Sequence, residues 1–252
     1  MTDGRPASRA DQPGNAVEAT LATLARPARL TSDEVGLVRA LKGHVESHEP
    51  GSDLTCRDGR HPRRRLMLEG WACRHHLLAD GRRQILQFIL PGDLIGFDAM
   101  APTPLDRGPV LALTRVVWAD GAALYDAVGG TPAGWSGLAT AITRAEKIAQ
   151  VRLIDHVVRL GRQSAYERMA HLLLELHERL SGAGLADGDS FPLPLTQEVI
   201  ADALALSVVH VNRVLQRLRA ERRIAVRGGR ATLLKPDALA LTAEYRSPYE
   251  RV

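Results

Sequence analysis

The segment LTQEVIADALALSVVHVNRVLQ, residues 195–216, decides the fold of the C-terminal part of the chain. It predicts two short helices joined by a tight turn, because Thr196 and Ser207 are favourable N-cap residues that each precede an apolar pattern of helical spacing. Ala201 is small enough for the second helix to cross closely. The apolar positions that give the pair one buried face are Ile200, Leu204, Leu206, Val211, Val214 and Leu215. This pattern is typical of a helix-turn-helix, whose second helix lies in the DNA major groove.

One position departs from that pattern. The turn usually contains glycine, because the residue there adopts a positive φ, whereas this chain has Ala205. An alanine in that conformation costs on the order of 1 kcal/mol, which a well-packed pair of helices tolerates. An ordinary α-helical hairpin in an all-helical core is therefore an alternative if the pattern is taken alone.

The residues that follow favour DNA binding. Apolar-alternating runs on both sides of Gly228-Gly229 predict a β-hairpin, which after a recognition helix is the wing of a winged helix. Basic charge on the second helix, its exit and the hairpin tip is typical of a phosphate-binding surface, although a solvated basic face would have the same composition. Residues 213–230 contain seven arginines and a single acidic residue, Glu221. The arginines are Arg213, Arg217, Arg219, Arg222, Arg223, Arg227 and Arg230.

The overall composition is that of a globular protein with two modest domains. The chain has 252 residues, of which 45% are hydrophobic and 25% charged. No apolar run is long enough to cross a bilayer and no signal peptide is evident, so we expect a cytoplasmic protein with no membrane partner. The net charge is only +4, so the basic character is local. This favours a DNA-binding domain attached to a neutral one.

The N-terminal half is expected to contain an arm and a sensor domain. Residues 1–29 have weak periodicity and predict a mobile arm with a short helix near Leu21–Leu24. Residues 30–132 begin with a capped helix at Thr31 and continue as short alternating segments, which predict an antiparallel β-barrel or jelly roll. The expected strands are Leu54–Arg57, Arg65–Leu68, Trp71–Leu78, Arg83–Leu90 and Val110–Trp118, with turns at Asp80-Gly81 and Pro91-Gly92-Asp93.

A long helix is expected over 133–160, followed by a hinge at Gly161, the winged helix-turn-helix domain over 161–241 and a tail over 242–252. The fold class is therefore α+β. A single long helix between two domains has little of its own chain to pack against, which predicts homodimerisation through it; packing on its own barrel is the alternative. The predicted dimer interface is the narrow seam of Leu138, Ile142, Ala145, Ala149, Leu153 and Val157.

A barrel, a long helix and a winged helix in this order resemble the Crp/Fnr family of bacterial transcription regulators. The resemblance covers about residues 31–236, and its most specific part is LTQEVIADALALSVVHVNRVLQRLRAERRI (195–224) followed by VRGGR (226–230). The turn PGDLIG (91–96) supports it. The resemblance implies a cytoplasmic homodimer that binds pseudo-palindromic double-stranded DNA, contacts RNA polymerase and moves its DNA-binding domains when the barrel senses a signal.

The same resemblance implies which residues contact DNA. The base-reading positions carried over are Val208, Val209, Asn212 and Arg213. Arg213 is suited to guanine and Asn212 to adenine, whereas Val209 stands where a glutamate is common and can contact only a thymine methyl group. This puts the family's usual operator in doubt. The predicted phosphate contacts are Gln197, Ser207, His210, Arg217, Arg227 and Arg230.

The sensor segment GDLIGFDAMAPTPLDRGP departs from the cyclic-nucleotide-binding members of the family. Arg107 lies at the right distance after the turn to meet a phosphate. However, Phe97 replaces the glutamate that would hold the ribose, Gly108 replaces a serine, and Pro109 lacks an N–H donor. We therefore expect no control by cyclic nucleotide. The iron–sulfur branch uses N-terminal cysteines, which residues 1–29 lack.

Cys73, His75 and His76, with Cys56, form the remaining sensor candidate, because thiolate and imidazole are ligands for haem and metals. Cys73 and His75 are expected to share one face of a strand and His76 the other. An ordinary half-buried strand explains the same residues. Cys73, His75 and Arg107 are thus weak candidates, no cofactor or metal is predicted, and the effector is unknown.

The leading interpretation is a non-enzymatic, DNA-binding transcription regulator. No paired Ser/His/Asp arrangement, metal-ligand spacing or phosphate-binding glycine loop indicates an enzyme. An alternative is a small-molecule, haem or redox sensor whose C-terminal domain acts on a protein partner. Salt dependence separates the two, because binding through several DNA phosphates weakens steeply as the salt concentration rises.

Overall fold

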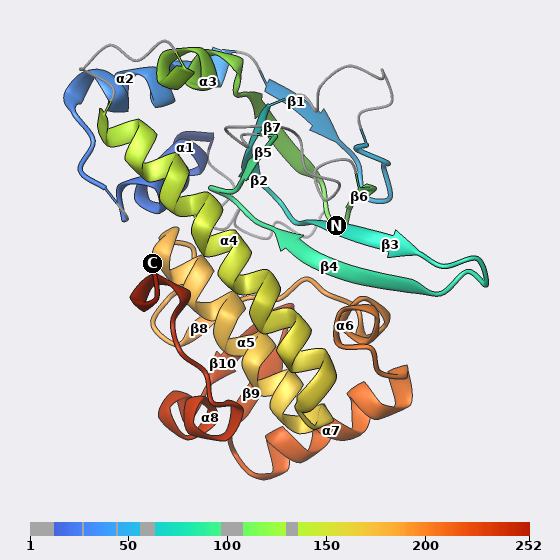
Figure 1. The fold of residues 1–252 in the computed structure, drawn as a ribbon. Helices are drawn as coiled ribbons and strands as arrows, with labels where there is room; N and C mark the ends of the chain where they lie inside the picture. Colours follow the sequence, from blue (N-terminus) through green and yellow to red (C-terminus); the bar gives the residue numbers. More distant parts are fainter. Residues whose placement is uncertain (1–12, 27, 44, 56–63, 97–107, 130–135) are drawn as a thin grey trace, which may run out of the picture.

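The computed structural model describes residues 13–26, 28–43, 45–55, 64–96, 108–129 and 136–252. Within these, two sheet-containing parts lie along one long helix, α4 (Ser136–Arg162), as Figure 1 shows. The fold is a mixture of helices and antiparallel sheets, which confirms the predicted α+β class. No helix among the described residues is long and apolar enough to span a membrane.

The described strands of the N-terminal part form two antiparallel sheets and do not close into one barrel. The sheet orders are β1-β7-β2-β5 and β4-β3-β6. Met67, Ile89, Val116 and Trp118 are buried between the strands. The strands are β1 (Val45–His48), β2 (Arg65–Glu69), β3 (Ala72–Leu77), β4 (Arg83–Ile89), β5 (Leu94–Ile95), β6 (Val110–Ala112) and β7 (Val116–Asp120). The segment predicted as one strand over 110–118 is thus two strands in different sheets. Of the strand expected at 54–57, Leu54 and Thr55 follow an isolated bridge at Asp53 and belong to no strand, and residues 56–57 lie outside the described part.

Two turns in this part form as predicted. The β3–β4 hairpin closes through Asp80-Gly81, where Leu78 N donates to Arg82 O at 2.8 Å. The turn at 91–93 places Gly92 at a φ of 94°. A Cβ on Gly92 would lie 2.4 Å from Thr23 Oγ1, so this turn needs glycine both for its backbone and for the close approach of the N-terminal helix.

Residues 13–25 form helix α1 (Pro13–Ala25), which contains the short helix predicted near Leu21–Leu24 but is longer and packed on the fold, so the prediction of a mobile arm is wrong here. Val17, Leu21 and Leu24 recur at helical spacing on this helix, and all three are buried. They pack against a core that contains Leu66 of β2 and Leu138 of α4. The proline, glycine and polar residues around them obscure this short apolar face. Residues 1–12 lie outside the described part.

Three further helical segments complete the N-terminal part: α2 (Ser32–Ala40), η2 (Leu41–Gly43) and α3 (Ala122–Gly129). The predicted capped start at Thr31 is a capping box with Glu34. The Glu34 carboxylate also accepts a hydrogen bond from Leu138 N at 2.7 Å, so one buried side chain organises the beginnings of both α2 and α4.

The seam predicted for dimerisation mostly packs within the chain. Leu138 and Ile142 are buried in the core of their own N-terminal part, so assigning them to a dimer interface is wrong. Ala145, Ala149 and Leu153 are half-buried and line an internal cavity. An apolar repeat of helical spacing can pack against another subunit or against the same chain, and here most of it packs against the same chain. Of the predicted seam, Val157 is exposed.

The C-terminal part follows a break in the helical backbone. Helix α4 continues through Gly161 to Arg162, so the break lies at 163–164 and not at the predicted glycine. Ser164 then caps α5 with a capping box. The remaining elements are α5 (Ala165–Gly182), β8 (Ser190–Pro192), α6 (Gln197–Leu204), α7 (Val208–Ala220), β9 (Ile224–Arg227), β10 (Arg230–Leu233), α8 (Pro236–Ala243) and η4 (Pro248–Glu250).

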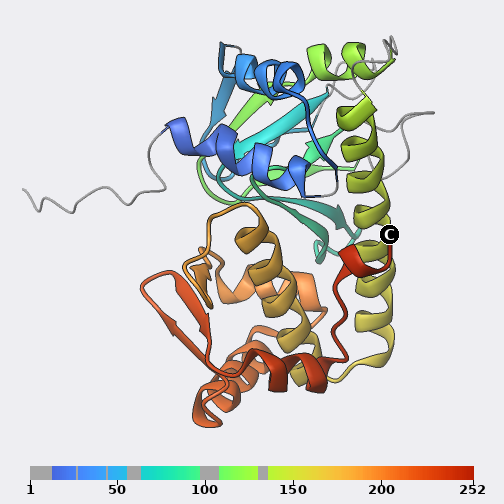
Figure 2. The same ribbon diagram turned by 90° about the vertical axis from the view of Figure 1, so that its left-hand side faces the viewer.

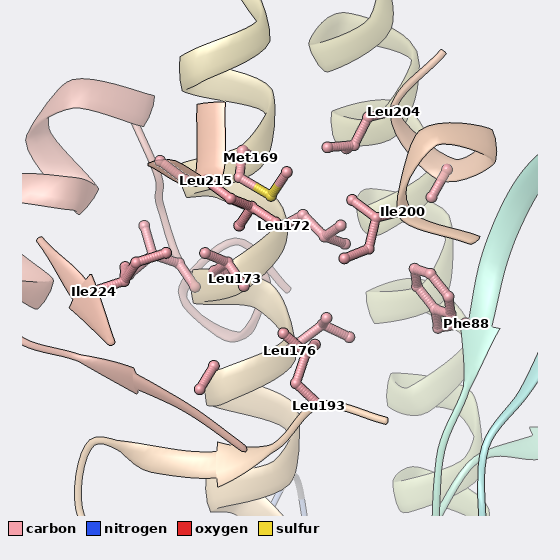
Figure 3. Packing of buried hydrophobic residues seen from close by; sticks show 14 of the residues in the cluster. Phe88, Met169, Leu172, Leu173, Leu176, Leu193, Ile200, Leu204, Leu215 and Ile224 are labelled. Atoms are coloured by element: carbon pink, nitrogen blue, oxygen red, sulfur yellow. The ribbon is translucent and has the colours of Figure 1, made fainter. Parts of the chain in front are cut away.

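The apolar face of α5 is the centre of the C-terminal core, as Figure 3 shows. The face itself consists of Met169, Leu172, Leu173 and Leu176, and the labelled residues that surround it are Phe88, Leu193, Ile200, Leu204, Leu215 and Ile224. Phe88 belongs to β4, so the two parts of the chain share this core. Polar contacts reinforce the junction, because Arg83 Nη2 lies 2.7 Å from Asp202 Oδ2 and Gln84 Nε2 donates to Ala203 O at 3.4 Å.

The C-terminal residues return from α8 to α4, as Figure 2 shows. Tyr245 donates a hydrogen bond to Glu178 of α5 at 2.6 Å. Further along, Tyr249 accepts one from Arg152 of α4, and Arg251 forms an ion pair with Asp155. The segment predicted only as a tail therefore connects the C-terminal part to the long helix.

Candidate nucleic-acid interface

The helix-turn-helix is formed by α6 and α7 with the expected caps. Thr196 Oγ1 accepts a hydrogen bond from Val199 N, and Ser207 Oγ accepts one from His210 N. Between the helices, Ala205 has φ 52° and ψ 47°, which is the left-handed conformation that the pattern requires. The turn thus has the predicted geometry despite the alanine.

Helix α7 is divided into a buried and an exposed face. Its buried residues are Val211, Val214, Leu215 and Leu218, which hold the helix on α5 and α6. The four predicted base-reading residues all lie on the exposed face: Val208, Val209, Asn212 and Arg213. The most exposed apolar one is Val209, at 66%. An exposed valine of this kind contributes nothing to the core of its own chain.

The predicted phosphate contacts near the start of the two helices are close to one another. Asn212 Nδ2 donates to Gln197 Oε1 at 3.3 Å, which links the second helix to the first. Ser207 is exposed, but its hydroxyl oxygen already accepts the cap bond from His210 N. His210 itself is exposed. Gln197, Ser207 and His210 therefore border the base-reading face.

Arg217 is engaged within the chain. Its Nε lies 2.8 Å from Glu221 Oε1, and its guanidinium lies over the Tyr166 ring at 4.7 Å. The Tyr166 hydroxyl donates to Glu221 Oε2 at 2.6 Å. Burial together with this bond to a carboxylate raises the pKa of Tyr166 to about 12. A phosphate contact by Arg217 would have to compete with the Glu221 carboxylate for the same guanidinium, an ion pair that sequence reasoning did not anticipate.

The wing is the predicted hairpin of β9 and β10. Gly228 and Gly229 form its tip with φ angles of 56° and 72°. Arg227 and Arg230 flank the tip and are exposed. Arg230 donates from Nη2 to Ser190 O at 3.1 Å, which binds it to β8 at the edge of the same sheet. Residues 190–192 thus supply a third strand to the wing.

The weak sensor candidates do not form a site within the described residues. Cys73 is fully buried beside Trp71 and Phe88, and burial raises the pKa of its thiol to about 11. Burial also lowers the pKa of half-buried His75. No group of three or more His, Cys, Asp or Glu side chains in this part of the chain is arranged to hold a metal ion. Cys56, Phe97 and Arg107 lie outside the described residues.

A second group of charged residues, which sequence reasoning missed, lies between α4 and α5. Arg159 Nη1 donates to Glu175 Oε2 at 3.1 Å, and Arg179 forms ion pairs with Glu175 and Asp93. Arg159 also donates to the Nδ1 atoms of two histidines. The buried members are His156, Arg159, His171, Glu175 and Arg179. Glu175 and Arg179 are four residues apart on α5, so their pairing was a signal available in the sequence.

Electrostatics within this buried cluster follow from its composition. Burial disfavours the charge of Glu175, but Arg159 and Arg179 outweigh it and lower the pKa to about 2. Burial, followed by the charge of Arg159, lowers the pKa of His156 and of His171 to about 4. Both histidines are thus neutral at pH 7, whereas the carboxylate and the arginines are charged.

Comparison with known proteins matches residues 167–242 to the model of the Crp-like helix-turn-helix domain. The nitrogen fixation regulation protein FixK of Rhizobium meliloti is 30% identical over 196 residues, which cover 77% of this chain and 85% of that protein. The protein of the same name from Bradyrhizobium diazoefficiens is 35% identical over 69% of this chain and 72% of its own length.

Solved structures agree with the sequence matches. The structure of FixK2 from Bradyrhizobium japonicum superposes with a TM-score of 0.66 and 25% identity, covering 79% of this chain and 96% of that one. The structure of a CooA mutant from Carboxydothermus hydrogenoformans superposes with a TM-score of 0.60 at 16% identity, over 81% and 90% of the two chains, and so shares the fold.

Proposed function

The chain belongs to the Crp/Fnr family of transcription regulators, and we propose that it acts as a homodimer on a pseudo-palindromic operator. The observation that carries this proposal is the two-faced helix α7. Four residues suited to base edges lie on its exposed side while its other side is held in the core. The wing adds exposed arginines beside it, as a phosphate-binding surface requires.

Each base-reading residue has a distinct role in this proposal. Arg213 donates two hydrogen bonds to the O6 and N7 atoms of a guanine. Asn212 turns from Gln197 to an adenine, exchanging one side-chain hydrogen bond for two with the base. Val209 packs against a thymine methyl group. Arg227 at the wing tip and the residues around the start of α6 bind phosphates and fix the register.

Dimerisation is assigned to the outer face of α4. Ile154, Val157 and Val158 are 61%, 64% and 51% exposed, although all three are apolar. Such a cluster on one helix marks an interaction surface, and two copies meeting through it would form a symmetric contact. A symmetric pair of recognition helices would then read half-sites about one helical turn apart. RNA polymerase is the further partner that family membership suggests.

The test of DNA recognition is the selection of binding sites from a random pool with the purified full-length protein. We expect a pseudo-palindromic motif with half-sites separated by about one helical turn. The selection is repeated with cyclic AMP, which we expect to leave the motif and its enrichment unchanged. Failure to enrich any DNA sequence, together with salt-independent binding of a protein partner, would favour the alternative that the C-terminal part binds protein.

The test of dimerisation is the molar mass in solution of the Val157→Glu variant. A charge placed in the centre of the outer face of α4 should convert a dimer into a monomer and remove cooperative operator binding. Thr143→Glu, at an exposed position of the same helix about three turns before Ile154, adds the same charge away from the apolar cluster and serves as the control. A Val157→Glu protein that stays dimeric would remove this face from the interface.

A further inference from the structure

A cavity of about 310 Å³ lies where the N-terminal sheet, the long helix and the helix-turn-helix meet. Ile85 and Phe88 of β4 form one wall and Leu172 of α5 another. Ala203 of α6 also lines it, so the cavity touches the first helix of the DNA-binding motif. The small side chains of Ala145 and Ala149 on α4 leave the space open. Its size is at the lower end of the range for small-molecule sites.

Hydrogen-bond donors without acceptors surround this largely apolar space. Within the described part of the chain, the Nε atoms of Arg152 and Arg159 are buried and have no hydrogen-bond partner. Both side chains line the cavity. Arg159 is only 4% exposed. Buried donors of this kind are rare in folded proteins because each costs free energy when it is left unpaired.

The protonation of His156 follows from its neighbour. Arg159 Nη2 lies 2.8 Å from His156 Nδ1 and can only donate, so Nδ1 accepts and the ring proton lies on Nε2. The Nε2–H group has the backbone of Ile85 as its partner, so the donors that remain are the Nε atoms of Arg152 and Arg159. A ligand that satisfies them must present acceptor atoms.

The acids around the cavity are partly neutralised already. Glu175 is bound by Arg159 and Arg179, and Asp93 by Arg179. Glu146 and Arg74 also line the cavity and have interactions of their own. Arg152 donates from Nη2 to the Tyr249 hydroxyl at 3.3 Å, and its charge also interacts with Asp93 and Glu175. Its Nε–H group nevertheless stays unpaired beside that of Arg159, so two cationic donors line the cavity.

From this arrangement we propose that the cavity binds a small carboxylic acid with an apolar body. The carboxylate accepts from the Nε donors of Arg152 and Arg159, while the hydrocarbon part lies against Ile85, Phe88 and the alanines of α4. A bound acid would touch β4, α4 and Ala203 at once. It would therefore change the seating of α6 on the sheet, which the Arg83–Asp202 ion pair now holds. This regulatory step rests on the proposed DNA-binding function, whereas acid binding itself does not.

Thermal unfolding of the full chain at pH 7 tests acid binding, with hexanoate and benzoate as probes. We expect at least one acid to raise Tm with a saturating dependence on its concentration. Hexanamide and benzamide, which match the acids in shape without the charge, should leave Tm unchanged. No response to either acid, an equal response to the amides, or a response to cyclic AMP alone would overturn the proposal.

Three variants locate the site. Ala149→Phe fills the cavity and should abolish the Tm response, and Arg152→Gln should weaken binding at least tenfold by isothermal titration calorimetry. The second variant stays informative if the first does not fold. Lys147→Gln removes a cation from the exposed side of the same helix and should respond like the unmodified chain. Unchanged acid binding in Arg152→Gln would overturn the assignment.

Operator affinity, measured with and without the responding acid, separates the two claims. A change in affinity supports coupling through α6. If the protein binds acid but no DNA, the proposed function fails while the acid site stands. If it binds DNA with unchanged affinity, the regulatory step fails alone.

Discussion

Arginines occupy two contrasting regions of this molecule. On α7 and the wing, Arg213 and Arg227 extend into solvent from a stretch that contains one acid. Between α4 and α5, Arg159 and Arg179 are 4% and 7% exposed and are paired with Glu175. In our proposal the arginines of the first region bind DNA, whereas those of the second region hold two parts of the fold together. Burial and nearby acids, and not the number of arginines, distinguish the two.

The largest expected effect is on the buried side of this comparison. Glu175→Gln removes the shared acid and leaves Arg159 and Arg179 without their common partner, so the free energy of unfolding should fall by about 3–5 kcal/mol. Urea denaturation measures it. Glu198→Gln, at an exposed position of α6, is the control and should change stability little. A loss no larger than that of the control would mean that the cluster does not hold α4 on α5.

The exposed side should show the opposite behaviour. Arg213→Ala should lower affinity for the selected operator by about 1–3 kcal/mol and relax discrimination at one base pair, because it removes a base contact. Its unfolding free energy should stay unchanged. Arg82→Ala at the β3–β4 hairpin removes an exposed arginine far from α7 and is the matched control in electrophoretic mobility shifts. Equal operator affinity of the two variants would contradict the assignment of Arg213.

Acid should weaken the buried region before the exposed one. The pKa values of His156 and His171 are lowered to about 4, whereas an ordinary histidine has a pKa of about 6.5. Between these two pH values the unfolded chain therefore binds protons that the folded chain does not. Stability should be full above about pH 6.5 and fall as pH decreases, by up to about 1.4 kcal/mol per pH unit for each histidine. His171→Leu should reduce this slope and His76→Gln, at an exposed position, should not. Stability that is constant from pH 6.5 to 5 would exclude neutral buried histidines.

The smallest expected effect concerns Arg217, which is exposed like the arginines of α7 and the wing but is paired with an acid like those of the buried cluster. Glu221→Gln releases its guanidinium from an exposed ion pair, and exposed pairs contribute little to stability. We therefore expect an unchanged Tm and a rise of up to a few-fold in operator affinity, since Arg217 can then reach a phosphate. Glu49→Gln, at an exposed position of the N-terminal part, controls for the loss of one acid. Lower operator affinity would show that the Glu221 bond positions Arg217 and does not hold it back.

Local signals in the sequence predicted the exposed region well. Thr196, Ser207 and Gly228-Gly229 act through a few neighbouring residues, so the caps, the turn and the wing follow from short stretches. The departure at Ala205 was also visible, and the backbone there is left-handed as expected. Predicting that α7 has an exposed face required only its helical period.

Long-range packing was not predictable in the same way. The burial of Val17 and Leu24 depends on a sheet and a helix far along the chain, so α1 was taken for an arm. The apolar repeat of α4 correctly predicted a helix, but the repeat alone does not show that Leu138 packs into the core of its own chain. Arg159 meets Glu175 only because α4 folds back against α5. The buried cluster and the cavity beside it arise from that packing.

Operator affinity as a function of salt concentration tests most directly whether the exposed arginines hold DNA. We predict that the logarithm of the association constant falls linearly with the logarithm of salt concentration, with a steep slope that reflects several phosphate contacts. Arg227→Ala at the wing tip should reduce the magnitude of that slope by about 1. Affinity that does not depend on salt, or a slope that Arg227→Ala leaves unchanged, would contradict a phosphate-binding role for this surface.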